Sequence, residues 1–136
     1  MTEDKSAENP YLMDYKKSLE EPDRRLYDLA VMVNGGYSNP ITVSVNGIIY
    51  SGMMVGEKEW LEENLRLIEL ANETPFSEEN IDYYKDLIHQ FDKGAPPRFL
   101  HMKEVNIISH PTANMPVFLW RIRLDKVDAF HLGRMP

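Results

Sequence analysis

The pattern of apolar and polar positions is most regular near the carboxyl end of the chain. Read with a period of two, four apolar residues share one face of a predicted strand: Phe118, Trp120, Ile122 and Leu124. Arg121 and Arg123 fall on the opposite face. This pattern predicts a half-buried strand whose aromatic groups pack inward and whose arginines form an outer cationic row.

A second pattern, in residues 41–52, predicts a β-hairpin. Asn46-Gly47 separates two apolar-rich runs, and this pair is preferred in two-residue turns because both positions need positive φ. A turn at this position sets two pairs of residues opposite each other: Val43 with Tyr50 and Val45 with Ile48. All four then share one face, so the register agrees with the apolar pattern.

Helical spacing of apolar residues predicts three helices. The first covers about residues 23–33, with Pro22 as its first helical residue. The second covers 57–71, and the third follows Ser77 as its N-cap. Residues 57–93 contain 11 acidic and 4 basic side chains. The second and third helices therefore form an acidic pair.

The order of the predicted elements indicates the fold class. A further strand is expected over residues 99–109, with an irregularity before Val105. The chain thus predicts an α+β fold with a small curled antiparallel sheet or a barrel of the SH3-like or Sm-like kind. An N-terminal helix precedes it and the acidic helical pair is inserted. We expect residues 1–20 to be a loose lead-in and residues 21–136 to form a single domain.

Composition and charge narrow the function classes. The 136 residues include no cysteine, which excludes disulfides and thiolate chemistry and fits the cytosol. No apolar run reaches membrane-spanning length. Residues 1–93 carry 19 acidic and 9 basic side chains, residues 94–136 carry 3 and 6, and the net charge is −7. The net negative charge argues against a dedicated nucleic-acid binder. The uneven distribution of charge along the chain is compatible with head-to-tail self-association.

The residue types that carry catalysis form no recognisable motif. The four histidines lack paired metal-ligand spacing: His89, His101, His110 and His131. No nucleophile elbow or phosphate-binding loop is present. We therefore expect no metal, no cofactor and no catalytic residue. An enzyme with a site assembled from Asp86, His89 or His101 is a less favoured alternative.

A further alternative is an Sm-like barrel that binds RNA weakly on its cationic face. Its aromatic groups would stack on bases and its basic groups would contact phosphates: Phe118, Trp120 and Phe130 with Arg121, Arg123, Lys126 and Arg134. The alternation in the last strands places Trp120 opposite the arginines, which favours a role in the core.

Three blocks of sequence, with the acidic helical stretch between the first two, carry a resemblance to a known family. The blocks are a hairpin at 43–54, a strand at 99–103, and Trp120-Arg121 followed by 127–133. In this order, over about residues 25–135, they resemble the gas vesicle accessory protein U family. The chain departs from the family at Ala129, where a glycine is expected, and by lacking a polar tail after Gly133.

The resemblance implies a cytoplasmic, non-enzymatic helper of gas vesicle assembly or clustering in a bacterium. Its partners would be the vesicle shell, other accessory proteins or copies of itself. We expect the contact surface to comprise a cationic row and its neighbours: Lys103, Arg121, Arg123, His131, Met53 and Met54. We expect a second set of residues to hold the strands that present this surface: Asn46, Gly47, Trp120, Phe130 and Gly133.

Overall fold

A computed structural model describes residues 22–71, 76–110 and 117–135. The expected lead-in over residues 1–20 lies outside these ranges. The helices are α2 (Arg24–Asn34), α3 (Glu57–Ala71), α4 (Phe76–Gln90) and a short 3-10 helix (Leu124–Lys126). The strands are β1 (Asn39–Val45), β2 (Ile48–Val55), β3 (Phe99–Ile107), β4 (Val117–Arg123) and β5 (Ala129–Leu132).

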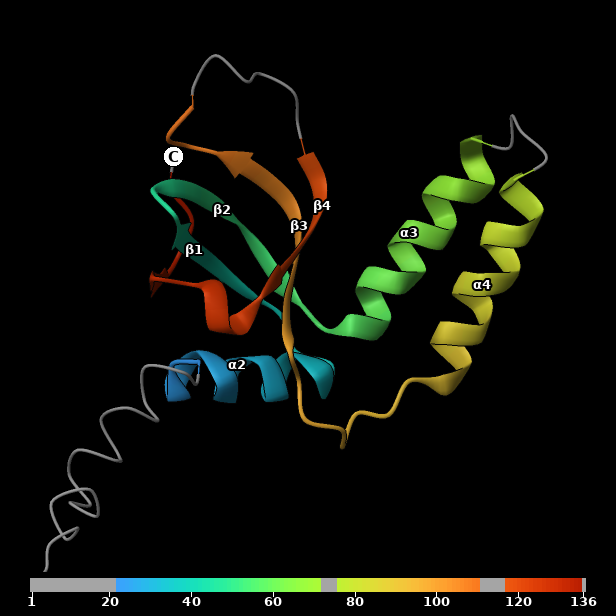
Figure 1. Ribbon diagram of the computed structural model, residues 1–136, viewed down its shortest axis with the longest axis horizontal. Helices are drawn as coiled ribbons and strands as arrows, with labels where there is room; N and C mark the ends of the chain where they lie inside the picture. The colour runs from blue at the N-terminus through green and yellow to red at the C-terminus, as the bar shows by residue number, and fades with distance from the viewer. Residues whose placement is uncertain (1–21, 72–75, 111–116, 136) are drawn as a thin grey trace, which may run out of the picture.

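The five strands form one antiparallel sheet in the order β4-β3-β2-β1-β5. The sheet is curled but open, because the outer strands β4 and β5 do not pair with each other. Helix α2 lies across one end of the curl, and α3 and α4 stand side by side next to β3 and β4 (Figure 1). The α+β class, the curled sheet, the N-terminal helix and the inserted helical pair are thus confirmed.

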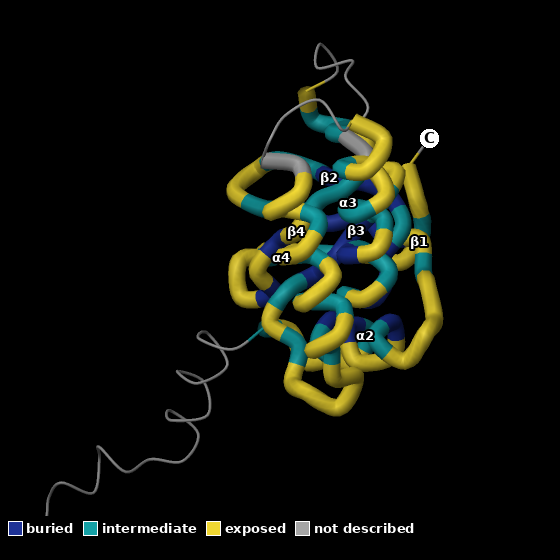
Figure 2. The backbone as a smooth tube through the Cα atoms, turned by 90° about the vertical axis from the view of Figure 1, so that its right-hand side faces the viewer, coloured by how far each residue is buried: buried dark blue, intermediate teal, exposed yellow. Residues whose placement is uncertain are grey.

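The core fills the concave side of the sheet. Leu26 and Val33 of α2 are buried against Ile41 and Val43 of β1 and Leu100 of β3. The buried stretches gather in the sheet and in α2, whereas most of α3 and α4 is exposed or half-buried (Figure 2). The helical pair therefore belongs to the outer face of the sheet and adds little to the main core.

The predicted hairpin is confirmed in position and register. Asn46 and Gly47 have φ values of 50° and 81°, as a two-residue turn of this kind requires. Val43 pairs with Tyr50, and the next pair toward the turn also follows the prediction: Val45 with Ile48.

The side-chain partition in β4 is confirmed as well. Trp120 packs against the core and stacks on Tyr50, with ring centroids 5.3 Å apart. Ile122 is buried beside it, while Arg121 and Arg123 are exposed on the other side. Phe118 lies in β4, but its side chain is outside the described part of the structure.

A β-bulge produces the irregularity expected before Val105. The β2–β3 register shifts between Ser51 and Met53, and Glu104 adopts a φ of 54°. Gly52 faces the bulge, where a Cβ atom would lie 2.8 Å from the carbonyl oxygen of Lys103. The bulge keeps Val105 in the core after the alternation of β3 is interrupted.

The structure corrects two helix starts. The carboxylate of Asp23 accepts hydrogen bonds from the backbone N–H groups of Arg25 and Leu26, so Asp23 is the N-cap of α2. Pro22 therefore precedes the cap and is not the first helical residue. Helix α4 begins at Phe76, so Ser77 lies inside the helix and the prediction that it is the N-cap was wrong.

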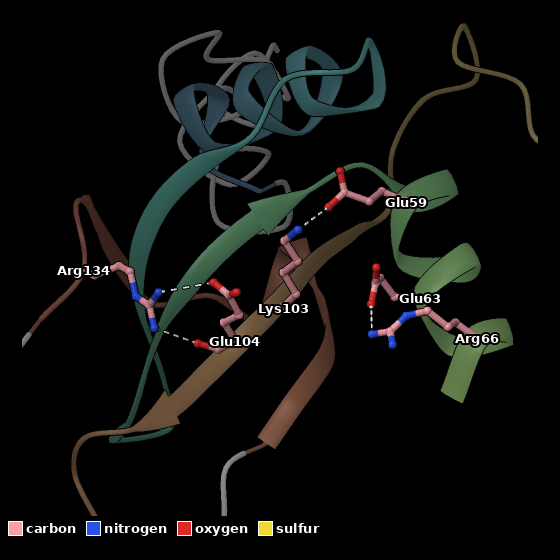
Figure 3. Close-up of polar contacts among 6 residues, drawn as sticks. All are labelled: Glu59, Glu63, Arg66, Lys103, Glu104 and Arg134. Atoms are coloured by element: carbon pink, nitrogen blue, oxygen red, sulfur yellow. Dashed lines mark hydrogen bonds and ion pairs between the residues drawn. The ribbon is translucent and has the colours of Figure 1, made fainter. Parts of the chain in front are cut away.

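The residues after β5 cross the outer face of the sheet as a C-terminal strap (residues 133–135). The hydroxyl of Thr42 donates a 2.8 Å hydrogen bond to the carbonyl oxygen of Gly133. The backbone N–H of Met135 donates to the hydroxyl of Ser51 at 2.8 Å. Arg134 reaches the bulge and donates to the carbonyl oxygen of Glu104 at 2.9 Å (Figure 3).

Candidate functional site

Helix α3 packs over the part of the outer face that carries the predicted cationic row. The ammonium nitrogen of Lys103 lies 2.9 Å from a carboxylate oxygen of Glu59 (Figure 3). One guanidinium nitrogen of Arg121 lies 3.7 Å from a carboxylate oxygen of Glu57. Two of the three predicted cations therefore face acidic side chains of the chain's own helical pair.

The environment of Lys103 keeps this group protonated. Its hydrogen bond to Glu59 raises the pKa of Lys103, partial burial opposes that shift, and the nearby carboxylates of Glu104 and Glu63 add to it. Lys103 is thus a permanent cation whose charge is largely balanced within the molecule.

Arg121 lies on an aromatic wall. Its guanidinium carbon is 3.7 Å from the ring centroid of Phe99 and 5.8 Å from that of Trp60. His101, its partner across β3 and β4, is buried and lies 5.0 Å from Trp60 between ring centroids. Burial, with the charge of Arg121 as a smaller cause, lowers the pKa of His101 to about 3, so this imidazole is neutral near pH 7.

Arg123 is the predicted cation that remains most available. Its side chain is 62% exposed, and its only ion pair among the described residues is with Asp125, at 2.8 Å. It lies on the rim of a groove of about 580 Å³, which we call the basic groove. The groove combines basic, acidic and apolar side chains: Pro22, Tyr27, Pro97, Arg98, Phe99, Arg123, Leu124 and Asp125.

The other predicted contact residues lie apart from this groove. Met53 is half-buried on the outer face and pairs with Lys103, so these two are brought together. His131 is exposed on β5, opposite Thr42, at the far side of the sheet. Met54 is 0% exposed within the core, so it can hold the sheet but cannot touch a partner.

The residues of the two alternative functions are not gathered into a site. Asp86 and His89 are exposed on α4, whereas His101 is buried in β3. Within the described ranges, no group of three or more acidic or histidine side chains could hold a metal ion. Trp120 and Phe130 pack on the core, on the opposite side of the sheet from Arg121, so they do not form one surface with it.

Sequence reasoning missed Arg98 and Phe99 as site residues. They follow the two prolines that lead into β3, and only the fold brings them next to Arg123 and Tyr27. It also missed that α3 would neutralise part of the cationic row. The opposite charges of residues 57–93 and 94–136 were the available signal for that contact.

Among the helices that the structure describes, none is long and apolar enough to cross a bilayer. The chain matches a family model described as Gas vesicle protein GvpU-like over residues 23–135. No curated protein and no solved structure matches the chain.

Proposed function

Because the chain belongs to the GvpU-like family of gas vesicle proteins, we propose that it is a non-enzymatic accessory protein of gas vesicle assembly or clustering. We propose that it acts in the cytoplasm and by protein–protein contact. The matched region covers nearly the whole chain, so the family assignment concerns the same domain that carries the basic groove.

The basic groove is the surface that best supports this proposal. Lys103 and Arg121 are paired with α3, but Arg98 has no ion pair with a described residue and Arg123 is mostly exposed. Tyr27 and Phe99 add aromatic walls to these cations. Aromatic and arginine side chains around a concave surface are typical of contact sites.

The chemistry of the groove specifies the kind of partner. The groove holds the guanidinium groups of Arg98 and Arg123, of which the second is paired with Asp125 but remains mostly exposed. Beside apolar walls, these groups fit an acidic segment that also carries an apolar side chain. We propose that this segment belongs to the vesicle shell or to another accessory protein. The cationic charge would accelerate the encounter, and the apolar walls would slow dissociation.

A second copy of the chain is a further candidate partner, because the acidic helical pair has matching properties. Leu70 and Tyr83 are 71% and 60% exposed among the acidic side chains of α3 and α4. The helical pair of one copy could therefore approach the basic groove of another. Such a contact joins two different surfaces, and it yields rings or open chains of molecules.

Genetic complementation tests the proposal. The gene for this chain would be deleted from a gas vesicle gene cluster, and the deletion strain would then express one of three proteins. These are the wild type, R98E/R123E and K85E/K93E. The last variant reverses two exposed charges outside the groove and is the matched control for contact with another protein. Lys85 lies on α4, so a contact between copies would be strengthened by this variant and would not be weakened. Electron microscopy of whole cells should show vesicle number or clustering restored by the wild type and the control, and not by R98E/R123E. Equal restoration by all three would contradict the proposed contact surface.

A further inference from the structure

A second cleft, which we call the His101 cleft, opens where α3 begins beside β3 and β4. Its volume is about 320 Å³, at the lower end of the range for small-molecule sites. Six of its lining residues have charged or aromatic side chains: Glu57, Asp92, Arg98, Phe99, His101 and Arg121. The cleft shares Pro97, Arg98 and Phe99 with the basic groove but has its own polar wall.

His101 is the first sign that the cleft takes a ligand. The residue is 5% exposed, and its Nε2 atom has no hydrogen-bond partner among the described residues. A buried ring nitrogen without a partner is costly, since most buried polar side chains in folded proteins are hydrogen-bonded. The imidazole is neutral near pH 7, so each ring nitrogen can either donate or accept one hydrogen bond.

Arg121 is the second sign. Phe99 holds its guanidinium group by stacking at 3.7 Å, which fixes the plane of the group. Its nearest described carboxylate, on Glu57, is 3.7 Å away and therefore beyond ordinary hydrogen-bond length. The planar edge of a guanidinium matches a carboxylate or phosphate group, and the long ion pair with Glu57 leaves hydrogen-bond donors of Arg121 for such a group.

The acidic residues of the cleft limit the size of the ligand's charge. Glu57 and Asp92 face the same space as Arg98 and Arg121, so two negative groups balance two positive ones. A polyanion such as a nucleic-acid strand would be repelled by these carboxylates. A single oxyanion with an adjacent hydrogen-bonding group would use Arg121 and, after a small movement of the imidazole ring, the unpartnered Nε2 atom of His101, which is itself almost inaccessible to solvent.

We propose that the His101 cleft binds a small molecule with one carboxylate or phosphate group, held by Arg121 and hydrogen-bonded to His101. This site adjoins the basic groove, the proposed contact surface for vesicle proteins, but Arg121 and His101 belong to the cleft alone. It makes the chain a ligand-binding domain, in which a bound metabolite fills the space between the start of α3, the segment 92–98 and strands β3 and β4.

The test is an NMR titration of the full ¹⁵N-labelled chain with succinate or inorganic phosphate, against sodium chloride at matched ionic strength. We expect saturable shifts centred on the backbone amides of Phe99, His101 and Arg121, together with the imidazole nitrogen signals of His101. Saturation by succinate alone identifies a carboxylate site, and saturation by phosphate alone identifies a phosphate site. No saturable shift with either anion would overturn the proposal.

Two arginine variants distinguish this site from general charge attraction. R121Q should weaken binding about tenfold or more, because it removes the planar cation. R123Q is the matched control, since it removes the same charge from the same strand outside the cleft, and it should bind as the wild type does. Equal weakening by both variants would overturn the proposal. R121K keeps the positive charge but lacks the planar guanidinium group, so it should weaken binding less than R121Q does. Its spectrum without anion should match that of the wild type, apart from signals near residue 121.

The result is independent of the proposed function. Loss of anion binding in R121Q with normal vesicle clustering would leave the contact surface intact. Loss of clustering in R123E, which leaves the lining of the cleft unchanged, with saturable shifts retained at His101 would leave the ligand site intact.

Discussion

The ammonium group of Lys103 on β3 lies 2.9 Å from a carboxylate oxygen of Glu59 on α3 (Figure 3). This contact joins the acidic helical pair to the cationic outer face of the sheet. Helix α3 has a single buried side chain among its described residues, Leu61, so burial contributes little to holding the helix on the sheet. Charge pairs with Glu57 and Glu59 therefore help to set where the helix rests.

We predict that the Lys103–Glu59 pair adds little to stability. The two side chains are 33% and 45% exposed, so solvent screens their attraction, and exposed pairs contribute about 0–1 kcal/mol. A double-mutant cycle with K103M and E59Q, measured by urea unfolding, should give a coupling of about 0.5 kcal/mol. A coupling above about 2 kcal/mol would mean that the pair acts as a buried one.

Gly52 should be among the least replaceable residues in the sheet. A Cβ atom there would lie 2.8 Å from the carbonyl oxygen of Lys103 and 3.1 Å from that of Glu104. Both contacts are with backbone, so the bulge would have to shift, at a cost of about 2–3 kcal/mol. Urea unfolding of G52A should show this loss, whereas G94A, at an exposed turn, should change stability by less than about 1 kcal/mol. Equal stability of the two variants would contradict the described bulge.

Several parts of the fold were predictable because local rules determine them. Asn46-Gly47 specifies a turn whose register is then fixed by the apolar residues on either side. The alternation around Trp120 and Arg121 separates an inner face from an outer one. Each of these inferences needs only a short stretch of chain.

The candidate site was only partly predictable because it depends on contacts between distant segments. The apolar stripe of α3 indicates that the helix packs on something, but not that it covers Lys103 and Arg121. Met53 and Met54 are adjacent in sequence, yet the pleat places one on each face and buries Met54. Arg98 and Tyr27 are far apart in sequence, and only the complete fold places both of them at the basic groove.

His101 should make stability fall as the pH falls. Its pKa is about 3 in the folded chain and near 6.5 in the unfolded chain, so the unfolded chain binds more protons between these values. The neutral imidazole of His101 contributes fully to the free energy of unfolding above about pH 6.5. At pH 5 the free energy of unfolding should be lower by about 2 kcal/mol.

Urea unfolding at pH 7 and pH 5 checks this dependence. Among the described residues, His101 is the only buried histidine or carboxylate side chain, so its imidazole should dominate the difference. The pH dependence should be weaker in H101Q than in the wild type, and it should be unchanged in H89Q, whose histidine is exposed. An identical pH dependence in H101Q and wild type would show that His101 does not titrate as a buried group.

Thr42 should hold the C-terminal strap in place. Its hydroxyl lies 3.0 Å from that of Ser51 and donates to the carbonyl oxygen of Gly133 at 2.8 Å. Replacement by valine keeps the shape and removes both hydrogen bonds, at a cost of about 1–2 kcal/mol. Hydrogen exchange at the Met135 amide, which bonds Ser51, should be about tenfold faster in T42V. An unchanged exchange rate would mean that the strap is held by other contacts.

The most direct test of the central claim, that the basic groove contacts gas vesicle proteins, is co-flotation of the purified chain with purified vesicles. The wild type and K85E/K93E should float with the vesicles at about 50 mM salt and be released at about 300 mM, as screening of charge contacts requires. R98E/R123E should be reduced about tenfold in the floating layer at low salt. Wild-type amounts of R98E/R123E in that layer would contradict the account.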